Sequence, residues 1–132
     1  MYLLDSNIFL ELLLNQDKAD EVEQFLRTKP KEKLYISEFS LYSIAIVLFH
    51  RKLFETFMRF LNDLIVAGGV RLLRLSVQDM EEVAAIALRF NLDFDDAYQH
   101  VAAEKLSLEI VSFDSDFDRT EKGRKTPAQL EV

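Results

Sequence analysis

Acidic residues follow several hydrophobic runs of this chain, although those runs lie far apart in the sequence. Asp5 follows the first run, Asp96 stands late in the chain, and Asp114 and Asp116 follow the last run. Carboxylates gathered at one edge of a sheet would repel one another and resist ionising together, unless divalent cations bind among them. These residue types therefore predict a metal-dependent active site with oxygen ligands.

Each carboxylate also has a purely structural interpretation. Asp96 would suit a helix start, where an acid caps the helix or is favoured by its dipole, and Asp5 would suit a capping turn. Asp114 and Asp116 fit an ordinary loop built on Asx turns. Because all four residues occur together beside predicted strands and helix starts, we favour the metal site.

The composition is that of one globular domain covering residues 1–132. Hydrophobic residues make up 49% and charged residues 30%, so the whole chain is expected to fold. Cysteine is absent, which excludes thiol nucleophiles and thiolate metal sites and fits a reducing compartment. The first residues lack the features of a signal peptide, and the apolar runs are too short to span a membrane. We therefore expect a cytoplasmic protein without a membrane partner.

The net charge of −7 argues against a general nucleic-acid coat protein, because affinity for phosphate backbones usually comes from clustered Lys and Arg. A nuclease remains compatible with this charge, since bound metal reverses the local field. With three glycines, the chain has no phosphate-cradling loop, and it has no Gly-x-Ser-x-Gly motif. Nucleotide-driven chemistry and a serine hydrolase are thus disfavoured.

Predicted strands alternate with predicted helices along the chain. We expect strands at 2–4, 34–36, 70–75 and 108–111. We expect helices at 8–14, 18–28, 37–50 and 51–67, one through residue 90 opened by a capping box at 76–79, and one from 95 or 96 to 105. This order predicts an α/β fold with a mainly parallel sheet, whose ligands lie beyond the carboxyl ends of the strands.

In three segments the sequence resembles the PIN-domain family, whose members include the toxin ribonucleases of VapBC-type toxin-antitoxin pairs. The segments read Leu-Asp-Ser-Asn at 4–7, Asp-Ala at 96–97 and Ser-Phe-Asp-Ser-Asp-Phe at 112–117. The resemblance covers essentially the whole chain. It implies a three-layer α/β/α PIN-like fold and a Mg²⁺- or Mn²⁺-dependent endoribonuclease acting on RNA. It also implies a homodimer and an antitoxin protein as partners.

The resemblance assigns roles to residues of the three segments. Asp5, Asp96 and Asp114 would be the metal ligands, and Asp116 would join them as a catalytic residue that orients a ligand or a water. The supporting polar residues would be Ser6, Asn7 and Ser112, which hold the loop or bond a carboxylate or phosphate oxygen.

The second acidic position of the family differs in this chain. In the family a Glu follows a strand-end Ser by six residues, and counting from Ser37 gives Ser43. Glu38 lies five positions earlier, which is about 500° of helical rotation, so it points away from the Ser43 direction. Three acids can still hold one ion, because Mg²⁺ often takes only one or two protein carboxylates. The alternative is a PIN domain that has lost catalysis and serves as an RNA-binding or protein-interaction module.

A third hypothesis is a phosphatase or phosphate-receiver domain with Asp5 as the aspartyl nucleophile. Proteins similar to the haloacid-dehalogenase type carry a second Asp two residues later. In this chain that position is Asn7, which disfavours this hypothesis.

Overall fold

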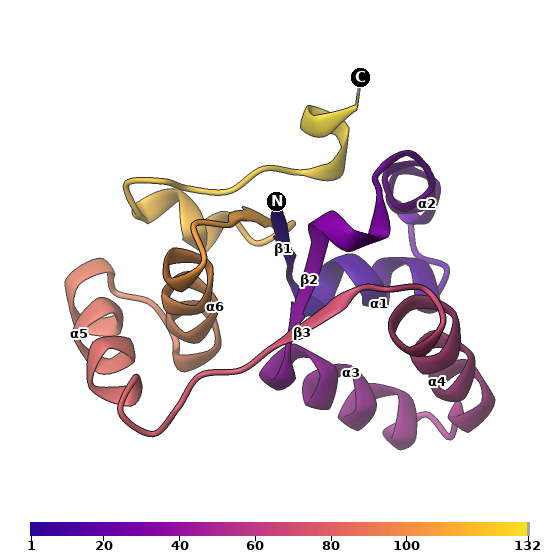
Figure 1. Ribbon diagram of the computed structural model, residues 1–132, viewed down its shortest axis with the longest axis horizontal. Coiled ribbons are helices and arrows are strands. Elements are labelled where there is room, and N and C mark those ends of the chain that lie inside the picture. The colour runs from indigo at the N-terminus through magenta and orange to yellow at the C-terminus, as the bar shows by residue number, and fades with distance from the viewer. Residues whose placement is uncertain (132) are drawn as a thin grey trace.

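The computed structural model describes residues 1–131, in which a small parallel sheet lies between two groups of helices (Figure 1). The strands are β1 (Tyr2–Leu4), β2 (Leu34–Ser37), β3 (Arg71–Leu73) and β4 (Glu109–Val111). The α-helices are α1 (Ser6–Leu13), α2 (Ala19–Thr28), α3 (Glu38–His50), α4 (Phe54–Phe60), α5 (Met80–Phe90) and α6 (Phe94–Lys105). The remaining elements are short. They are the 3₁₀ turns η1 (Lys31–Lys33), η3 (Ser115–Arg119) and η4 (Pro127–Leu130) and the π-helical turn η2 (Leu61–Val66).

All four strands run parallel, in the order β3-β2-β1-β4. The register pairs Leu4 of β1 with Val111 of β4, so these two neighbouring strands end side by side. The residues that follow them, Asp5 and Ser112, must therefore leave the sheet at the same edge. The predicted parallel sheet is confirmed.

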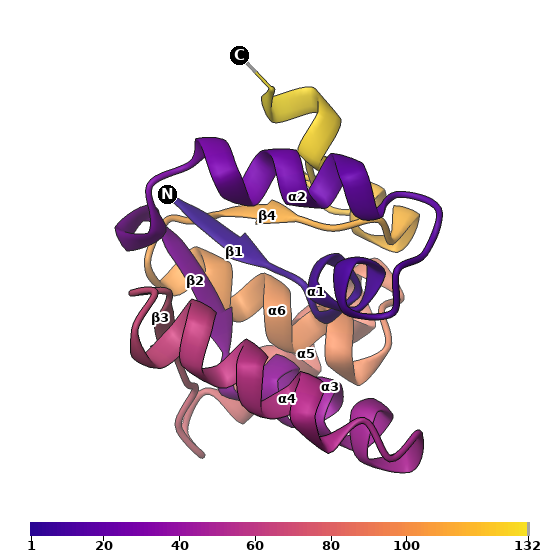
Figure 2. The same ribbon diagram turned by 90° about the vertical axis from the view of Figure 1, so that its right-hand side faces the viewer.

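Helices cover both faces of the sheet and form two separate hydrophobic cores. The first core joins the sheet to α5 and α6, and the second joins it to α1, α2, α3 and α4. Figure 1 shows these two groups on opposite sides of the strands. Figure 2 shows the C-terminal turn η4 beside α2, where the backbone N–H of Ala128 donates to Glu21 Oε1 at 2.8 Å. The three-layer α/β/α arrangement is thus confirmed.

The predicted helix at 51–67 starts later than expected and is not a regular α-helix throughout. Lys52 has a φ of 60°, which ends α3 and delays the start of α4 to Phe54. The helix then loosens into the π-helical turn η2, which ends at Val66. At Gly68, just beyond this turn, an added Cβ would clash with the carbonyl oxygen of Asp63. The apolar periodicity of this segment is continuous, so it does not reveal these backbone changes.

The two helices before β4 begin slightly away from their predicted positions. Ser76 and Asp79 exchange the hydrogen bonds of the predicted capping box, although regular α5 starts only after the box, at Met80. Asp93 occupies the N-cap position of α6, so Asp96 lies inside the first turn. Within residues 1–131, no helix combines the length and apolar character needed to cross a membrane.

Candidate metal centre

Asp5 and Ser112 meet where β1 and β4 end. Ser112 Oγ donates a hydrogen bond of 2.7 Å to Asp5 Oδ2, and the backbone N–H of Ser6 donates to Asp5 Oδ1 at 2.8 Å. Asp5 is 8% exposed and serves as the N-cap of α1. The helix start thus fixes the carboxylate at the edge of the sheet, where parallel sheets bind ligands.

Asn7 ties the start of α1 to the loop after β4. Its amide nitrogen Nδ2 donates to Ser112 Oγ at 3.1 Å, and its Oδ1 accepts from the backbone N–H of Phe113 at 3.2 Å. The amide therefore holds together two segments that are 105 residues apart. Ser6 contributes its backbone N–H to the Asp5 carboxylate.

The turn η3 brings two further carboxylates to this edge. Asp114 caps the turn, because its Oδ1 accepts from the backbone N–H of Asp116 at 2.9 Å. Phe117 follows with a fully buried ring in the core shared with α6. This ring anchors the turn, so the positions of Asp114 and Asp116 depend on core packing as well as on the loop itself.

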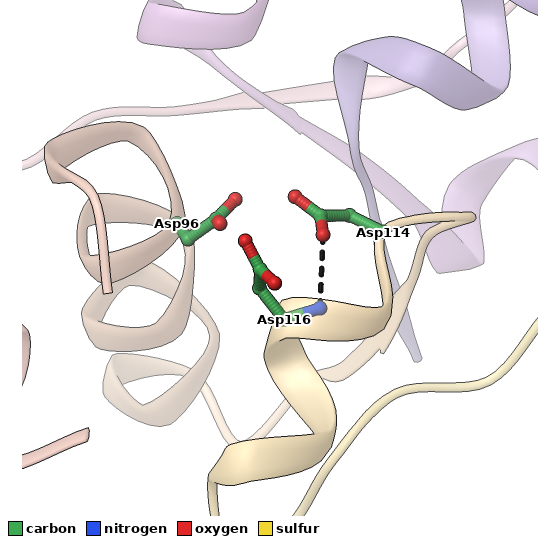
Figure 3. A group of neighbouring side chains, drawn as sticks. All are labelled: Asp96, Asp114 and Asp116. Atoms are coloured by element: carbon green, nitrogen blue, oxygen red, sulfur yellow. Dashed lines mark hydrogen bonds between the residues drawn. The ribbon is translucent and has the colours of Figure 1, made fainter. Parts of the chain in front are cut away.

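Asp96 completes a compact group with Asp114 and Asp116. One carboxylate oxygen from each residue lies within 4.8 Å of the others, and Figure 3 shows the three side chains pointing toward one another. Ligands on opposite sides of Mg²⁺ at ~2.1 Å are ~4.2 Å apart, so three oxygens at this spacing can share one ion. Hard carboxylate oxygens are the donors that Mg²⁺ and Mn²⁺ prefer. The residues present therefore fit a small divalent cation.

The electrostatics of the group favour a bound cation. Burial, reinforced by the neighbouring charges of Asp114 and Asp95, raises the pKa of Asp96 to about 8. Burial also raises the pKa of Asp5, although hydrogen bonds from Ser112, Gln99 and Ser6 oppose this effect. Carboxylates crowded in this way resist ionising together, and a divalent cation would remove the conflict.

The structure separates the predicted site residues into two sets. Asp96, Asp114 and Asp116 form the compact group, whereas Asp5 lies next to it and raises the pKa of Asp96 through its charge. From the sequence we expected Asp5 to be a ligand and Asp116 to have an orienting role. In the structure Asp116 belongs to the compact group, and Asp5 is fixed beside it by hydrogen bonds.

Within residues 1–131, α3 contributes no carboxylate to the group. Ser37 caps this helix, with its Oγ accepting from the backbone N–H of Ser40 at 3.0 Å. Glu38 instead pairs with Arg74 at 3.6 Å between Oε2 and Nε, and Ser43 is half-buried on the helix. The helix entry therefore follows the predicted cap and does not turn Glu38 into the second acid.

Three residues near the group were not among the predicted site residues. Gln99 and Ser40 are both buried and hydrogen-bonded to each other at 2.7 Å, and Gln99 also donates to Asp5 at 3.2 Å. Arg119 lies 3.2 Å from Asp116 and partly neutralises its charge. The signal for Gln99 was its position three residues after Asp96, which places both side chains on one helix face.

The model of the PIN domain family matches residues 2–123. A search of curated protein sequences found no relative.

Several solved structures share the fold at low sequence identity. FitAB bound to a DNA fragment has a TM-score of 0.81 and 19% identity, covering 100% of this chain and 99% of that chain. Mycobacterium tuberculosis VapC20, a sarcin-ricin loop cleaving toxin, has a TM-score of 0.76 and 16% identity, covering 89% and 93%. A toxin-antitoxin complex from Klebsiella pneumoniae has a TM-score of 0.74 and 22% identity, covering 96% and 98%. With the family model spanning nearly all of its residues, this chain belongs to the PIN domain family.

Proposed function

We propose that this chain is a metal-dependent endoribonuclease that hydrolyses RNA phosphodiester bonds with Mg²⁺ or Mn²⁺. The observation that carries the proposal is the convergence of Asp96, Asp114 and Asp116 within 4.8 Å at the carboxyl edge of the sheet. A divalent cation bound there would lower the pKa of a coordinated water and neutralise charge on the scissile phosphate. Membership of the PIN domain family supports the same chemistry.

The residues of the site would have different roles. Asp96, Asp114 and Asp116 would hold the cation, while Asp5 would supply a further negative charge from its hydrogen-bonded position. Arg119, 3.2 Å from Asp116, would keep that carboxylate oriented. With both oxygens of Asp5 accepting hydrogen bonds, this residue is poorly disposed to act as the nucleophile of a phosphatase or receiver domain.

We further propose that the chain acts in the cytoplasm as the toxin of a toxin-antitoxin pair, as a homodimer that binds an antitoxin protein. The support is a set of large apolar side chains exposed on α3 and α4. They are Tyr42, Ile46, Phe49, Phe54 and Met58. An exposed apolar surface of this kind is typical of protein-binding faces.

The second candidate function is a PIN domain without catalysis that binds RNA or another protein. It is favoured by the missing carboxylate on α3, where Ser43 stands at the expected position and Glu38 pairs with Arg74. Such a domain would bind RNA equally well with and without metal and would not cleave it. The two candidates therefore differ in one measurable property.

Cleavage of labelled RNA separates the candidates. Purified protein is incubated with 5′-labelled transfer and ribosomal RNA in Mn²⁺, in Mg²⁺ and in EDTA. We expect discrete cleavage with metal, none in EDTA, and a loss of at least about 100-fold in Asp96→Asn and Asp114→Asn. Asp20→Asn, on the exposed surface of α2, is the matched control and should cleave normally. RNA binding without cleavage in any metal would support the non-catalytic module instead.

A further inference from the structure

Gln99 connects three separate elements at the site. Its side chain is 1% exposed on α6, and its Nε2 donates to Asp5 Oδ1 at 3.2 Å and to Ser40 Oγ at 2.7 Å. One amide group therefore links α6 to the end of β1 and to the first turn of α3. Because Asp96 lies three residues earlier on α6, this link also fixes Asp5 relative to the carboxylate group.

Core packing alone does not explain a glutamine at this position. The Oε1 atom of Gln99 is buried and has no hydrogen-bond partner in the part of the chain that the structure describes. A buried acceptor without a partner lowers stability, and an apolar side chain of the same length would avoid that loss. Glutamine differs from such a side chain by the two hydrogen bonds that Nε2 donates.

Asp5 is held by neutral donors. Its oxygens accept from the backbone N–H of Ser6, from Ser112 Oγ, from Gln99 Nε2 and, at 3.4 Å, from Asn7 Nδ2. Ser6 and Ser112 come from the ends of β1 and β4, whereas Gln99 comes from the helix that carries Asp96. Neutral donors stabilise the carboxylate and leave its negative charge available to a nearby cation.

We propose that Gln99 is a positioning residue of the metal site, which orients the Asp5 carboxylate beside Asp96, Asp114 and Asp116 while it is itself held by Ser40. The proposal rests on the proposed metal-dependent function and adds a residue to it. The Ser40 hydroxyl and the Gln99 amide connect α3 to the site. This is the helix on which the family carries its second acid.

Mn²⁺ titration by calorimetry tests this role in the full chain, with circular dichroism to verify folding. Gln99→Met keeps the length of the side chain and removes the donor. We expect Mn²⁺ affinity to fall about tenfold, the scale of losing one hydrogen bond to a charged group. Gln24→Met, on an exposed helical position of α2, is the matched control and should keep the wild-type affinity. Equal affinities of wild type and Gln99→Met would overturn the proposal.

Gln99→Glu distinguishes positioning from a simple effect of charge. If residue 99 acted only through charge, a new carboxylate would tighten Mn²⁺ binding. Positioning predicts weaker binding, because the introduced carboxylate replaces the donor to Asp5 with a group that repels it. Tighter binding in Gln99→Glu would contradict the role. Should Gln99→Met fail to fold, Ser40→Ala removes the support of the amide and should weaken binding about threefold.

A double-mutant cycle between Asp5→Asn and Gln99→Met, measured by urea unfolding in EDTA, tests the contact without metal. We expect the two changes to be coupled at least about fivefold in the unfolding equilibrium constant, as for residues in direct contact. Coupling below about twofold would refute the positioning role. Absence of Mn²⁺ binding in the wild type, with coupling intact, would refute the proposed nuclease while leaving the orientation of Asp5 by Gln99 established.

Discussion

Ser112 Oγ donates a 2.7 Å hydrogen bond to Asp5 Oδ2 across the ends of two neighbouring parallel strands, joining residues 107 positions apart in the sequence. The same hydroxyl accepts from Asn7 Nδ2 at 3.1 Å and from the backbone N–H of Asp114 at 2.9 Å. One buried serine thus links the start of α1 to the loop that carries the other carboxylates.

Replacing this hydroxyl should weaken both the fold and the site. Ser112→Ala leaves Asp5 and Asn7 each short of a partner, and we expect a loss of about 2 kcal/mol in the free energy of unfolding. Urea unfolding of wild type and variant measures it. The control is Ser115→Ala, an exposed serine in the same loop, which should stay within about 0.5 kcal/mol of wild type. Equal stabilities for the two variants would show that the Ser112 network contributes nothing.

Asp96 should make the metal-free protein less stable as the pH rises. Its folded pKa of about 8 lies above its ordinary value of 3.8, so between these values the unfolded chain releases a proton that the folded chain retains. Stability contributed by the protonated group is therefore complete below pH 3.8 and is lost as the pH rises toward 8. In EDTA, Asp96→Asn should unfold at a higher temperature than wild type at pH 8, by on the order of 5 °C, with little difference near pH 4.

Melting curves from pH 4 to pH 9 check the sign of this effect. The advantage of Asp96→Asn should grow with pH and level off above about pH 8. A constant difference across the range would mean that the carboxylate titrates normally. Saturating Mn²⁺ should reverse the order of the two melting temperatures at pH 8. The cation would stabilise the wild type, whereas Asp96→Asn lacks one of its ligands.

Asp79 should show the opposite pH dependence. Hydrogen bonds from Lys105 and from the backbone and hydroxyl of Ser76 lower its pKa to about 2. Its stabilising contribution is therefore present above pH 3.8 and is lost as the pH falls toward 2. Asp79→Asn should melt slightly below wild type at pH 6, and the two should converge near pH 2. A difference in melting temperature that persists near pH 2 would mean that the charge of Asp79 does not stabilise the start of α5.

Phe117 should affect the metal site through packing alone. Its ring is fully buried next to α6, and Phe117→Ala should lower the free energy of unfolding by about 3–5 kcal/mol. Since the ring anchors η3, the variant should also bind Mn²⁺ more weakly than the milder Phe117→Leu. Calorimetry at a temperature where both variants remain folded makes the comparison. Unchanged affinity in Phe117→Ala would show that the loop holds Asp114 and Asp116 without help from the core.

The layers of the fold were predictable because local signals carry them. Short apolar runs that alternate with helical periodicity predict parallel strands covered on both faces, and Ser37 marks its helix start correctly. The 76–79 box forms its hydrogen bonds, although regular α5 starts only at Met80. The break at Lys52 and the π-helical turn were not predictable, because the apolar pattern runs through both without interruption.

The site was predictable at the level of residue types and less so in its geometry. Register places Asp5 and Ser112 together, and this follows once β1 and β4 are neighbours. Which carboxylates lie close enough to share one ion depends on side-chain contacts among α6, η3 and the core. That is why Asp116 joins the compact group while Asp5 is held beside it, and why Gln99 was missed.

Mn²⁺ titration of the wild-type protein by calorimetry tests the metal centre most directly, with Asp96→Asn, Asp114→Asn and the surface control Asp20→Asn measured beside it. We expect binding in wild type and in Asp20→Asn, and a loss of at least about tenfold in affinity in each site variant. No binding by folded wild-type protein at millimolar Mn²⁺, or equal binding by all four proteins, would contradict a metal centre formed by Asp96, Asp114 and Asp116.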